Sequence, residues 1–380
     1  MGVLFVKKLF ILFLTSIIVL SAAGCTNSSD VENTTSLVSG KKVAYIMQMS
    51  SSDIFQTWSQ SAQKTAEALG MEYEAFFCEG SDDVWKDTVS KCAAEGYDGL
   101  LLSHGGKDYS YTFLTDLKNQ YPDLKIVTFD TLFEDSNGET QKIEGVTQFF
   151  QQDANLTELL LDYVCNDLYP EKVASSEPVN ILKVWVGPGF LSPFDRRQEG
   201  YAKYEEQGLI RTVDTIAPSD FSNAESSIAE ITTDALEKYS EEEIDAIWCC
   251  YDLYANGVYT ALTQGGYDIP MVSVDICNAD IEKMKSENSP WKACATTNWK
   301  YNGEFGIRVL ALEMTGEYDK IIDPITGEIN DWLEIPGSIV TQDMVLGKEV
   351  DVTNLDTVAG KEYSDNSWMP TTDWMQNLLN

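Results

Sequence analysis

Short apolar runs alternate along most of the chain with longer segments in which apolar residues recur every three or four positions. The clearest example is the segment 41–70, where an apolar run over 43–47 leads through a polar loop over 50–53 into a periodic segment. The periodic apolar residues are Trp58, Ala62, Ala66 and Leu69. Residues at these spacings share one face of a helix, and Gly70 is typical of the position just after a helix end. The pattern therefore predicts a strand, a loop and a helix in succession.

This strand–helix unit recurs roughly every 25–30 residues, and the pattern starts again near residue 179. There an apolar run over 179–186 is followed by a loop rich in Gly and Pro over 187–193. Such alternation predicts parallel sheets covered by helices, because a helical crossover returns each strand alongside an earlier one. We therefore predict an α/β protein with two similar, doubly wound parallel-sheet lobes. A last strand is expected over 335–345, and the pattern does not place the segment 351–380.

The first forty residues are not expected to belong to either lobe. Residues 1–24 have the features of a signal peptide: early Lys residues, an apolar run over 9–20 that is short for a membrane span, and small residues before Cys25. This resembles a bacterial lipoprotein signal with Cys25 as the lipidated residue, although Ala22 replaces the usual large aliphatic residue. Ordinary cleavage after Ala23 is the alternative. The segment 25–40 is rich in Ser, Thr and Asn and predicts a flexible tether.

Composition excludes several classes of function. The 380 residues include 61 acidic and 26 basic side chains, a formal net charge of −35, which excludes nucleic acid as a partner. The 8 cysteines form no C-x-x-C pair and the single histidine is His104, so we expect neither a metal site nor a cofactor. Apart from Cys25, most cysteines are expected to be buried as small apolar residues. The sequence has no G-x-S-x-G, H-E-x-x-H or P-loop motif, which disfavours an exported hydrolase.

Five short motifs occur in order along the two predicted halves. They are the helix end 62–70, Arg197-x-x-Gly200, 218–221 (PSDF), Asp252-x-x-Ala255-x-Gly257 and Val272-x-Val274-Asp275. Over about residues 41–315 this series resembles the type I periplasmic solute-binding proteins, and in particular the ribose- and galactose-binding class that serves ABC importers. The resemblance implies two lobes that close on a sugar and are joined by three chain crossings.

The resemblance also implies how the chain is divided between the lobes. The first lobe would comprise 41–148 plus about 299–330, and the second 149–298 plus about 335–350. The segment 351–380 would follow as a tail without an assigned place. A monomer is expected, with an ABC permease as its protein partner.

The candidate ligand contacts, most of them at positions that match the family's, follow predicted strands or lie in loops and helices near them. They are Phe55, His104, Asp130, Arg197, Phe221, Tyr251, Asp252, Asp275 and Asn298. Carboxylate, amide and guanidinium groups bond the hydroxyls of a sugar, and aromatic rings cover its apolar face. Two departures argue against ribose itself: Thr131 stands where the family has Arg, and Tyr251 where Asn is common.

Several of these residues have a structural alternative. Phe55 is either a stacking residue or a core anchor at a helix start, whereas Trp58 is expected to pack in the core. His104 is placed either at the rim of the site or in contact with the ligand. Arg197 could serve a salt bridge, and Asp252 could cap the helix that follows it. The register at Asn298 is open by one residue.

The sequence thus predicts a lipid-anchored receptor that captures a sugar for an ABC importer and performs no covalent chemistry. It would lie on the outer face of the cytoplasmic membrane, held there by lipid on Cys25, or in a periplasm. Another binding function is the alternative: a receptor for a nucleoside or a signalling furanosyl compound, or a protein that presents its ligand to a membrane sensor kinase.

Overall fold

The computed structural model describes residues 35–239 and 243–379. The predicted signal peptide, the lipidation at Cys25 and most of the predicted tether lie outside the described residues, so they stay predictions. Within the described part, no helix combines the length and the apolar character needed to cross a membrane.

The first sheet has six strands, each parallel to its neighbours, in the order β11-β5-β4-β3-β1-β2. The strands are β1 (Lys42–Met47), β2 (Glu72–Phe77), β3 (Gly99–Ser103), β4 (Lys125–Phe129), β5 (Val146–Gln151) and β11 (Trp332–Ile335). Strands β3 and β5 are buried along their whole length, as expected for parallel strands that carry helices on both faces. We call this sheet with its helices the first lobe.

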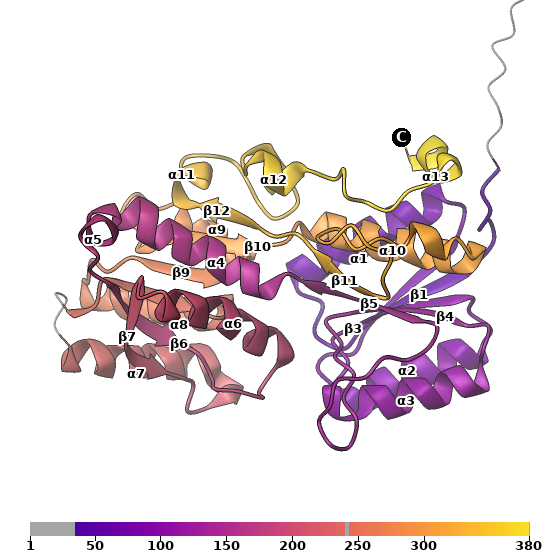
Figure 1. Ribbon diagram of the computed structural model, residues 1–380, viewed down its shortest axis with the longest axis horizontal. Coiled ribbons are helices and arrows are strands. Elements are labelled where there is room, and N and C mark those ends of the chain that lie inside the picture. The colour runs from indigo at the N-terminus through magenta and orange to yellow at the C-terminus, as the bar shows by residue number, and fades with distance from the viewer. Residues whose placement is uncertain (1–34, 240–242, 380) are drawn as a thin grey trace, which may run out of the picture. The chain divides into compact units, whose positions relative to one another are not determined.

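Two helices cover each face of the first sheet (Figure 1). They are α1 (Asp53–Ala68) with α10 (Trp299–Thr315), and α2 (Asp82–Ala94) with α3 (Lys107–Gln120). Strand β1 shows the alternation directly, because Tyr45 joins the core cluster under α1 while Ala44 joins the cluster under α2. Trp58 is fully buried in the cluster under α1, which confirms the predicted core role of this residue.

The second sheet also has six strands, in the order β12-β10-β9-β8-β6-β7. The strands are β6 (Val179–Val184), β7 (Ile210–Ile216), β8 (Ala246–Cys249), β9 (Met271–Val274), β10 (Trp291–Thr296) and β12 (Ser338–Thr341). Only β12 runs antiparallel to its neighbour, β10. We call this sheet with its helices the second lobe. The two sheets confirm the predicted α/β fold with two similar halves.

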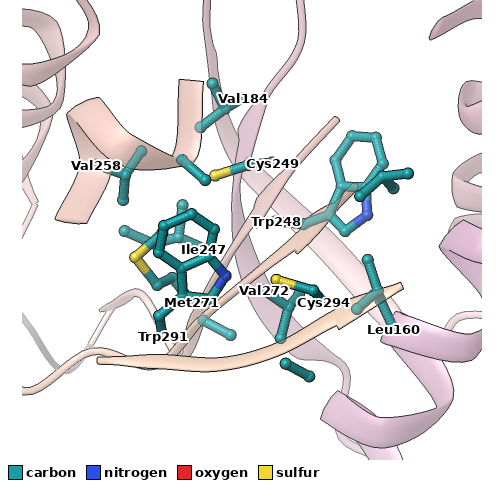
Figure 2. Packing of buried hydrophobic residues seen from close by; sticks show 14 of the residues in the cluster. Leu160, Val184, Ile247, Trp248, Cys249, Val258, Met271, Val272, Trp291 and Cys294 are labelled. Atoms are coloured by element: carbon teal, nitrogen blue, oxygen red, sulfur yellow. The ribbon is translucent and has the colours of Figure 1, made fainter. Parts of the chain in front are cut away.

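The helices of the second lobe pack in pairs, α4 against α6 and α7 against α8. The helices are α4 (Asp153–Tyr163), α6 (Ser192–Glu206), α7 (Ala224–Lys238), α8 (Asp252–Gly265) and α9 (Asn278–Met284), with a π-helical turn at Val164–Leu168 and a short α5 (Pro170–Ser175). Figure 2 shows Trp248 of β8 on the side of Leu160 from α4, whereas Cys249 lies on the side of Val258 from α8. All seven described cysteines are free thiols, and only Cys277 is not fully buried, which confirms their predicted role as small apolar residues.

The chain passes between the lobes between β5 and α4, between β10 and α10, and between β11 and β12. The predicted single strand over 335–345 is wrong. Strand β11 ends at Ile335, β12 belongs to the other sheet, and α11 (Gln342–Val345) follows. Pro336 has no backbone N–H for a sheet, and a Cβ on Gly337 would lie 2.0 Å from Cδ2 of Leu156. These two residues therefore form a tight crossing.

The C-terminal tail, which the sequence did not place, contacts both lobes. Its helical pieces are a 3₁₀ turn at Leu355–Thr357, α12 (Lys361–Ser364) and α13 (Asp373–Leu379). Leu355 and Tyr363 are buried in the core cluster of the second lobe, whereas Met369 and Met375 are buried in a core cluster of the first lobe. The tail therefore adds a fourth physical connection between the lobes.

Candidate ligand-binding site

Three predicted site residues follow strands directly and share an unusual backbone conformation. His104 after β3, Asp130 after β4 and Asp275 after β9 have φ values of +59°, +44° and +70°. This left-handed region costs a residue with a Cβ roughly 1–2 kcal/mol, a cost that glycine avoids. Strained positions of this kind concentrate at functional sites. The carboxyl ends of parallel strands are also where ligands bind in open α/β sheets.

Arg197 of α6 lies at the centre of a buried ionic network. Its side chain is 2% exposed, and its Nε donates to Oδ1 of Asp153 at 2.8 Å. Its Nη1 donates to the carbonyl of Cys250 at 2.7 Å, and its Nη2 lies 3.1 Å from Oδ2 of Asp275. Because these three partners surround the guanidinium group, it is fixed in position, and it fixes Asp275 in turn.

Arg196, the neighbouring residue, links the two lobes. Its Nη2 donates to Oδ1 of Asp130 in the first lobe at 2.9 Å, and it also pairs with Asp153 at the start of α4. A second contact between the lobes joins Oδ2 of Asp53, in the first turn of α1, to the backbone N–H of Asn278 at 3.0 Å. Polar groups thus hold the two strand-end surfaces against each other.

The two strand-end carboxyl groups are buried and differ in how they are satisfied. Asp130 receives hydrogen bonds from Arg196 and from Gln151. Asp275 has one oxygen beside Arg197, but its Oδ1 is buried and has no hydrogen-bond partner among the described residues. Burial raises the pKa of both carboxyl groups, and Arg197 opposes this rise at Asp275. An unsatisfied buried oxygen can accept a hydrogen bond from a ligand hydroxyl.

His104 is held as a neutral ring among aromatic side chains. Burial, assisted by the positive charge of Arg197, lowers the pKa of His104 to about 4. The ring lies edge-on to Phe55 at 5.4 Å and to Phe129 at 5.5 Å between centroids. Its Nδ1 forms a hydrogen bond with the hydroxyl of Ser103. Phe55 itself is 6% exposed and belongs to the core cluster of the first lobe.

The predicted aromatic residue of the second lobe, Phe221, is exposed and stacks on another phenylalanine. Its ring lies 4.8 Å from that of Phe190 at an interplanar angle of 19°. Phe190, in the loop before α6, was not identified from the sequence. Asp153 and Arg196 were not identified from the sequence either. The sequence shows Arg196 and Arg197 side by side, and the motif register selected Arg197 alone.

Two other predicted residues, Tyr251 and Asn298, make their side-chain contacts with residues outside the ionic network. Tyr251 is half-buried and packs against Phe194 at 5.6 Å and Tyr254 at 5.5 Å. Asn298 caps α10 by accepting from the N–H of Lys300, and its Nδ2 donates to the carbonyl of Tyr363 in the tail. Both polar ends of Asn298 therefore serve the fold in this structure.

One group of residues has spacing suited to a metal ion. Within the described ranges, Asp252, Cys277 and Asp280 offer ligand atoms that lie within 4.8 Å of one another. Asp280, however, accepts from the N–H of Cys277 at 2.7 Å and from Asn256 at 2.9 Å, and so closes the start of α9. Asp252 accepts from the N–H of Leu253. These contacts give the acidic group a structural role at two helix starts.

A cavity of about 200 Å³ lies between the lobes beside this network. It is lined by His104 and Asp130 from the first lobe and by Phe190 from the second. A larger cavity of about 430 Å³ lies among α1, α10 and the tail, and it includes none of the predicted site residues. Of the predicted site residues, only His104 and Asp130 line the smaller cavity. We place the candidate site there because residues of both lobes line it.

No protein-family model matches the chain, and no curated protein matches it. Several solved structures, however, are similar to the chain. A sugar ABC transporter structure from Yersinia enterocolitica subsp. enterocolitica 8081 is similar with a TM-score of 0.69 and 25% identity, covering 89% of this chain and 94% of that one. The solute-binding protein of a 5-methylthioribose transporter from Thermotoga lettingae TMO, in complex with 5-methylthioribose, has a TM-score of 0.69, 18% identity and coverages of 89% and 98%.

A third similar structure is the periplasmic binding protein of an arabinose ABC transporter from Shewanella sp. ANA-3, bound to L-arabinofuranose. Its TM-score is 0.61 at 13% identity, with coverages of 80% and 93%. These neighbours are components of transporters rather than enzymes. The fold of this chain is that of the type I periplasmic binding proteins, and the predicted resemblance is confirmed at that level.

Proposed function

We propose that this protein is an extracytoplasmic solute-binding protein, which captures a sugar between its two lobes and delivers it to an ABC importer. The fold and the similarity to the Yersinia sugar transporter structure support this function. The proposal involves no covalent step. It requires only that the ligand contact both strand-end surfaces, so that binding stabilises the closed arrangement.

The free oxygen of Asp275 is the observation that carries the proposal. It is buried, faces no donor among the described residues, and belongs to a carboxyl group fixed by Arg197. The network around it has three carboxyl groups, Asp130, Asp153 and Asp275, and two guanidinium groups, Arg196 and Arg197. A network with three carboxyl groups for two guanidinium groups, and with one carboxyl oxygen left without a donor, suits a neutral ligand rich in hydroxyl donors, which describes a sugar.

Calorimetry with a panel of monosaccharides, nucleosides and polyols tests the proposal. We expect at least one sugar to bind with a stoichiometry of one per chain. Asp275→Asn should weaken that binding at least about tenfold, because hydrogen bonds to a charged group contribute about 1.5–3 kcal/mol. The exposed carboxylate of Asp268 provides the matched control, and Asp268→Asn should bind as the wild type does. Binding of no sugar, or equal binding by both variants, contradicts the proposal.

We propose further that Cys25 carries a lipid that anchors the protein to the outer face of the cytoplasmic membrane. The small residues before Cys25 and the polar segment after it support this placement. Cys25→Ala should move the full-length protein from the membrane fraction to the soluble fraction. If the variant stays with the membrane, another segment is the anchor. With the lipid on Cys25, the tether would let a monomeric receptor approach a permease in the same membrane.

A further inference from the structure

The cavity between the lobes has one side that is almost wholly apolar. Met49 and Leu132 contribute to it from the first lobe, and Phe190, Leu191 and Pro193 contribute from the second. We call these five residues the apolar compartment. Asp130 also lines the cavity and pairs with Arg196 of the ionic network, whereas Asp275 does not line the cavity. The site therefore offers two different surfaces to one ligand.

The polar side chains that line the same cavity are already paired within the protein. The amide of Gln48 donates to Asp82 at 3.0 Å, and the ammonium group of Lys107 lies 3.4 Å from a carboxylate oxygen of Glu134. His104 bonds the hydroxyl of Ser103 through its Nδ1. Gln48 and Lys107 would give up these partners if they turned to a ligand, so this side of the cavity mainly offers apolar surface.

Phe190 is exposed but held in place. It is 44% exposed, and its ring stacks on Phe221 at 4.8 Å and on Phe194 at 6.3 Å. The loop that carries it is fixed by Asp195, whose carboxylate accepts from the N–H of Gly189 at 2.9 and 3.0 Å. Stacked rings in a fixed loop lose little conformational entropy when they cover a ligand. An aromatic side chain presented in this way is suited to apolar contact.

We propose that the ligand is a sugar that carries an apolar substituent, such as a thioether, alkyl or aryl group. This inference rests on the proposed sugar-binding function and deepens it. The hydroxyls lie on the side of Asp130, which lines the cavity and joins the ionic network through Arg196, and the substituent occupies the apolar compartment between Met49 and Phe190. An unsubstituted sugar leaves that compartment without a matching surface, and the apolar contact energy is then lost.

Paired ligands test the inference by calorimetry: ribose against 5-methylthioribose, and glucose against phenyl β-D-glucopyranoside. We expect the substituted member of at least one pair to bind about tenfold or more tightly than its parent, the usual scale for one apolar group in a pocket. If parent sugars bind as tightly as their derivatives, this inference fails while the proposed function stands. If no sugar of the wider panel binds, the proposed function fails and the inference fails with it.

The variant Phe190→Ala gives a second, independent readout. Because Phe190 is exposed, we expect the variant to fold with nearly unchanged stability. It should weaken the substituted ligand about tenfold and the parent sugar by less than about twofold. Ile329, which is 64% exposed and does not line this cavity, provides the control variant Ile329→Ala, with no effect on either ligand. Equal losses for both ligands on Phe190→Ala would overturn the inference.

Discussion

The residues after β3, β4 and β9 combine backbone strain, burial and charge. His104, Asp130 and Asp275 each keep a side chain where glycine would relieve the backbone. Arg196 and Arg197 compensate the buried carboxyl groups, and Asp275 keeps one oxygen without a protein partner. At the scale of single residues, contacts among the protein's own groups thus hold the site residues in position.

His104 is expected to stay uncharged across the physiological range. Burial and the charge of Arg197 lower the pKa of His104 to about 4 in the folded protein. Since His104 is the single histidine, its imidazole ring protons can be followed by NMR without overlap. We expect a titration midpoint near 4, and a midpoint near 6.5 would contradict the buried position of the ring.

The lowered pKa of His104 also makes the stability of the fold depend on pH. Below about pH 6.5 the unfolded chain binds a proton that folded His104 does not, so the free energy of unfolding falls as the pH drops toward 4. The slope from this group is at most about 1.4 kcal/mol per pH unit. His104→Asn, which tolerates the positive φ, should remove this part of the pH dependence while the other acidic groups keep theirs.

At the scale of elements, most helices and strands could be predicted from apolar periodicity. Strand β1 was clear as a short apolar run, and helix α1 was clear from the buried apolar residues Trp58, Ala62 and Ala66 at intervals of four. The segment 335–345 was wrongly predicted as one strand, because its apolar residues continue across the crossing at Pro336-Gly337. The strands on the two sides of that crossing belong to different sheets. The position of the tail could not be predicted, because its buried residues, such as Leu355 and Met369, lie far apart in sequence and pack in two different cores.

The candidate site was predictable where a polar residue directly follows a strand or belongs to a recognised motif, as Arg197 does. Asp130 and Asp275 directly follow strands, and Asp275 also ends one of the five motifs. Asp153 and Phe190 could not be found in that way, because one begins a helix and the other lies in an irregular loop. Their roles depend on which elements meet in three dimensions, and periodicity carries no such information.

The motif glycine Gly200 sets the distance between α4 and α6. A Cβ at this position would lie 2.2 Å from the carbonyl oxygen of Ala154. Asp153 and Arg197 come from these two helices, so the close approach also allows their ion pair. Gly200→Ala should lower the free energy of unfolding by about 1–3 kcal/mol through overpacking, measured by urea denaturation.

The control for this variant is Glu206→Ala, an exposed position near the end of α6. It should change stability by less than about 0.5 kcal/mol. If Gly200→Ala is as stable as this control, the helices do not approach as closely as the structure indicates.

At the scale of the whole molecule, the tail ties the crossings to both lobes. Asn298, at one crossing, donates to the carbonyl of Tyr363, and Arg308 of α10 donates to the carbonyl of Pro370. Trp374 donates to the carboxylate of Glu317 in the first lobe. The tail is therefore part of the folded body and limits how the lobes can separate.

Met375 tests whether the tail packs in solution as it does in the structure. Its side chain is fully buried in the first-lobe core, so Met375→Ala should cost about 2 kcal/mol of stability. The neighbouring Gln376 is exposed, and Gln376→Ala should have an effect below about 0.5 kcal/mol. Equal unfolding midpoints for the two variants would show that the tail does not contribute to the core.

The central claim is that a sugar binds between the lobes and bonds the free oxygen of Asp275. A crystal structure with the tightest sugar of the calorimetric panel tests it most directly. The account predicts a sugar hydroxyl within hydrogen-bond distance of Oδ1 of Asp275, with contacts from both lobes to the same molecule. A sugar bound outside this cavity, or one that leaves Oδ1 of Asp275 without a partner, would contradict it.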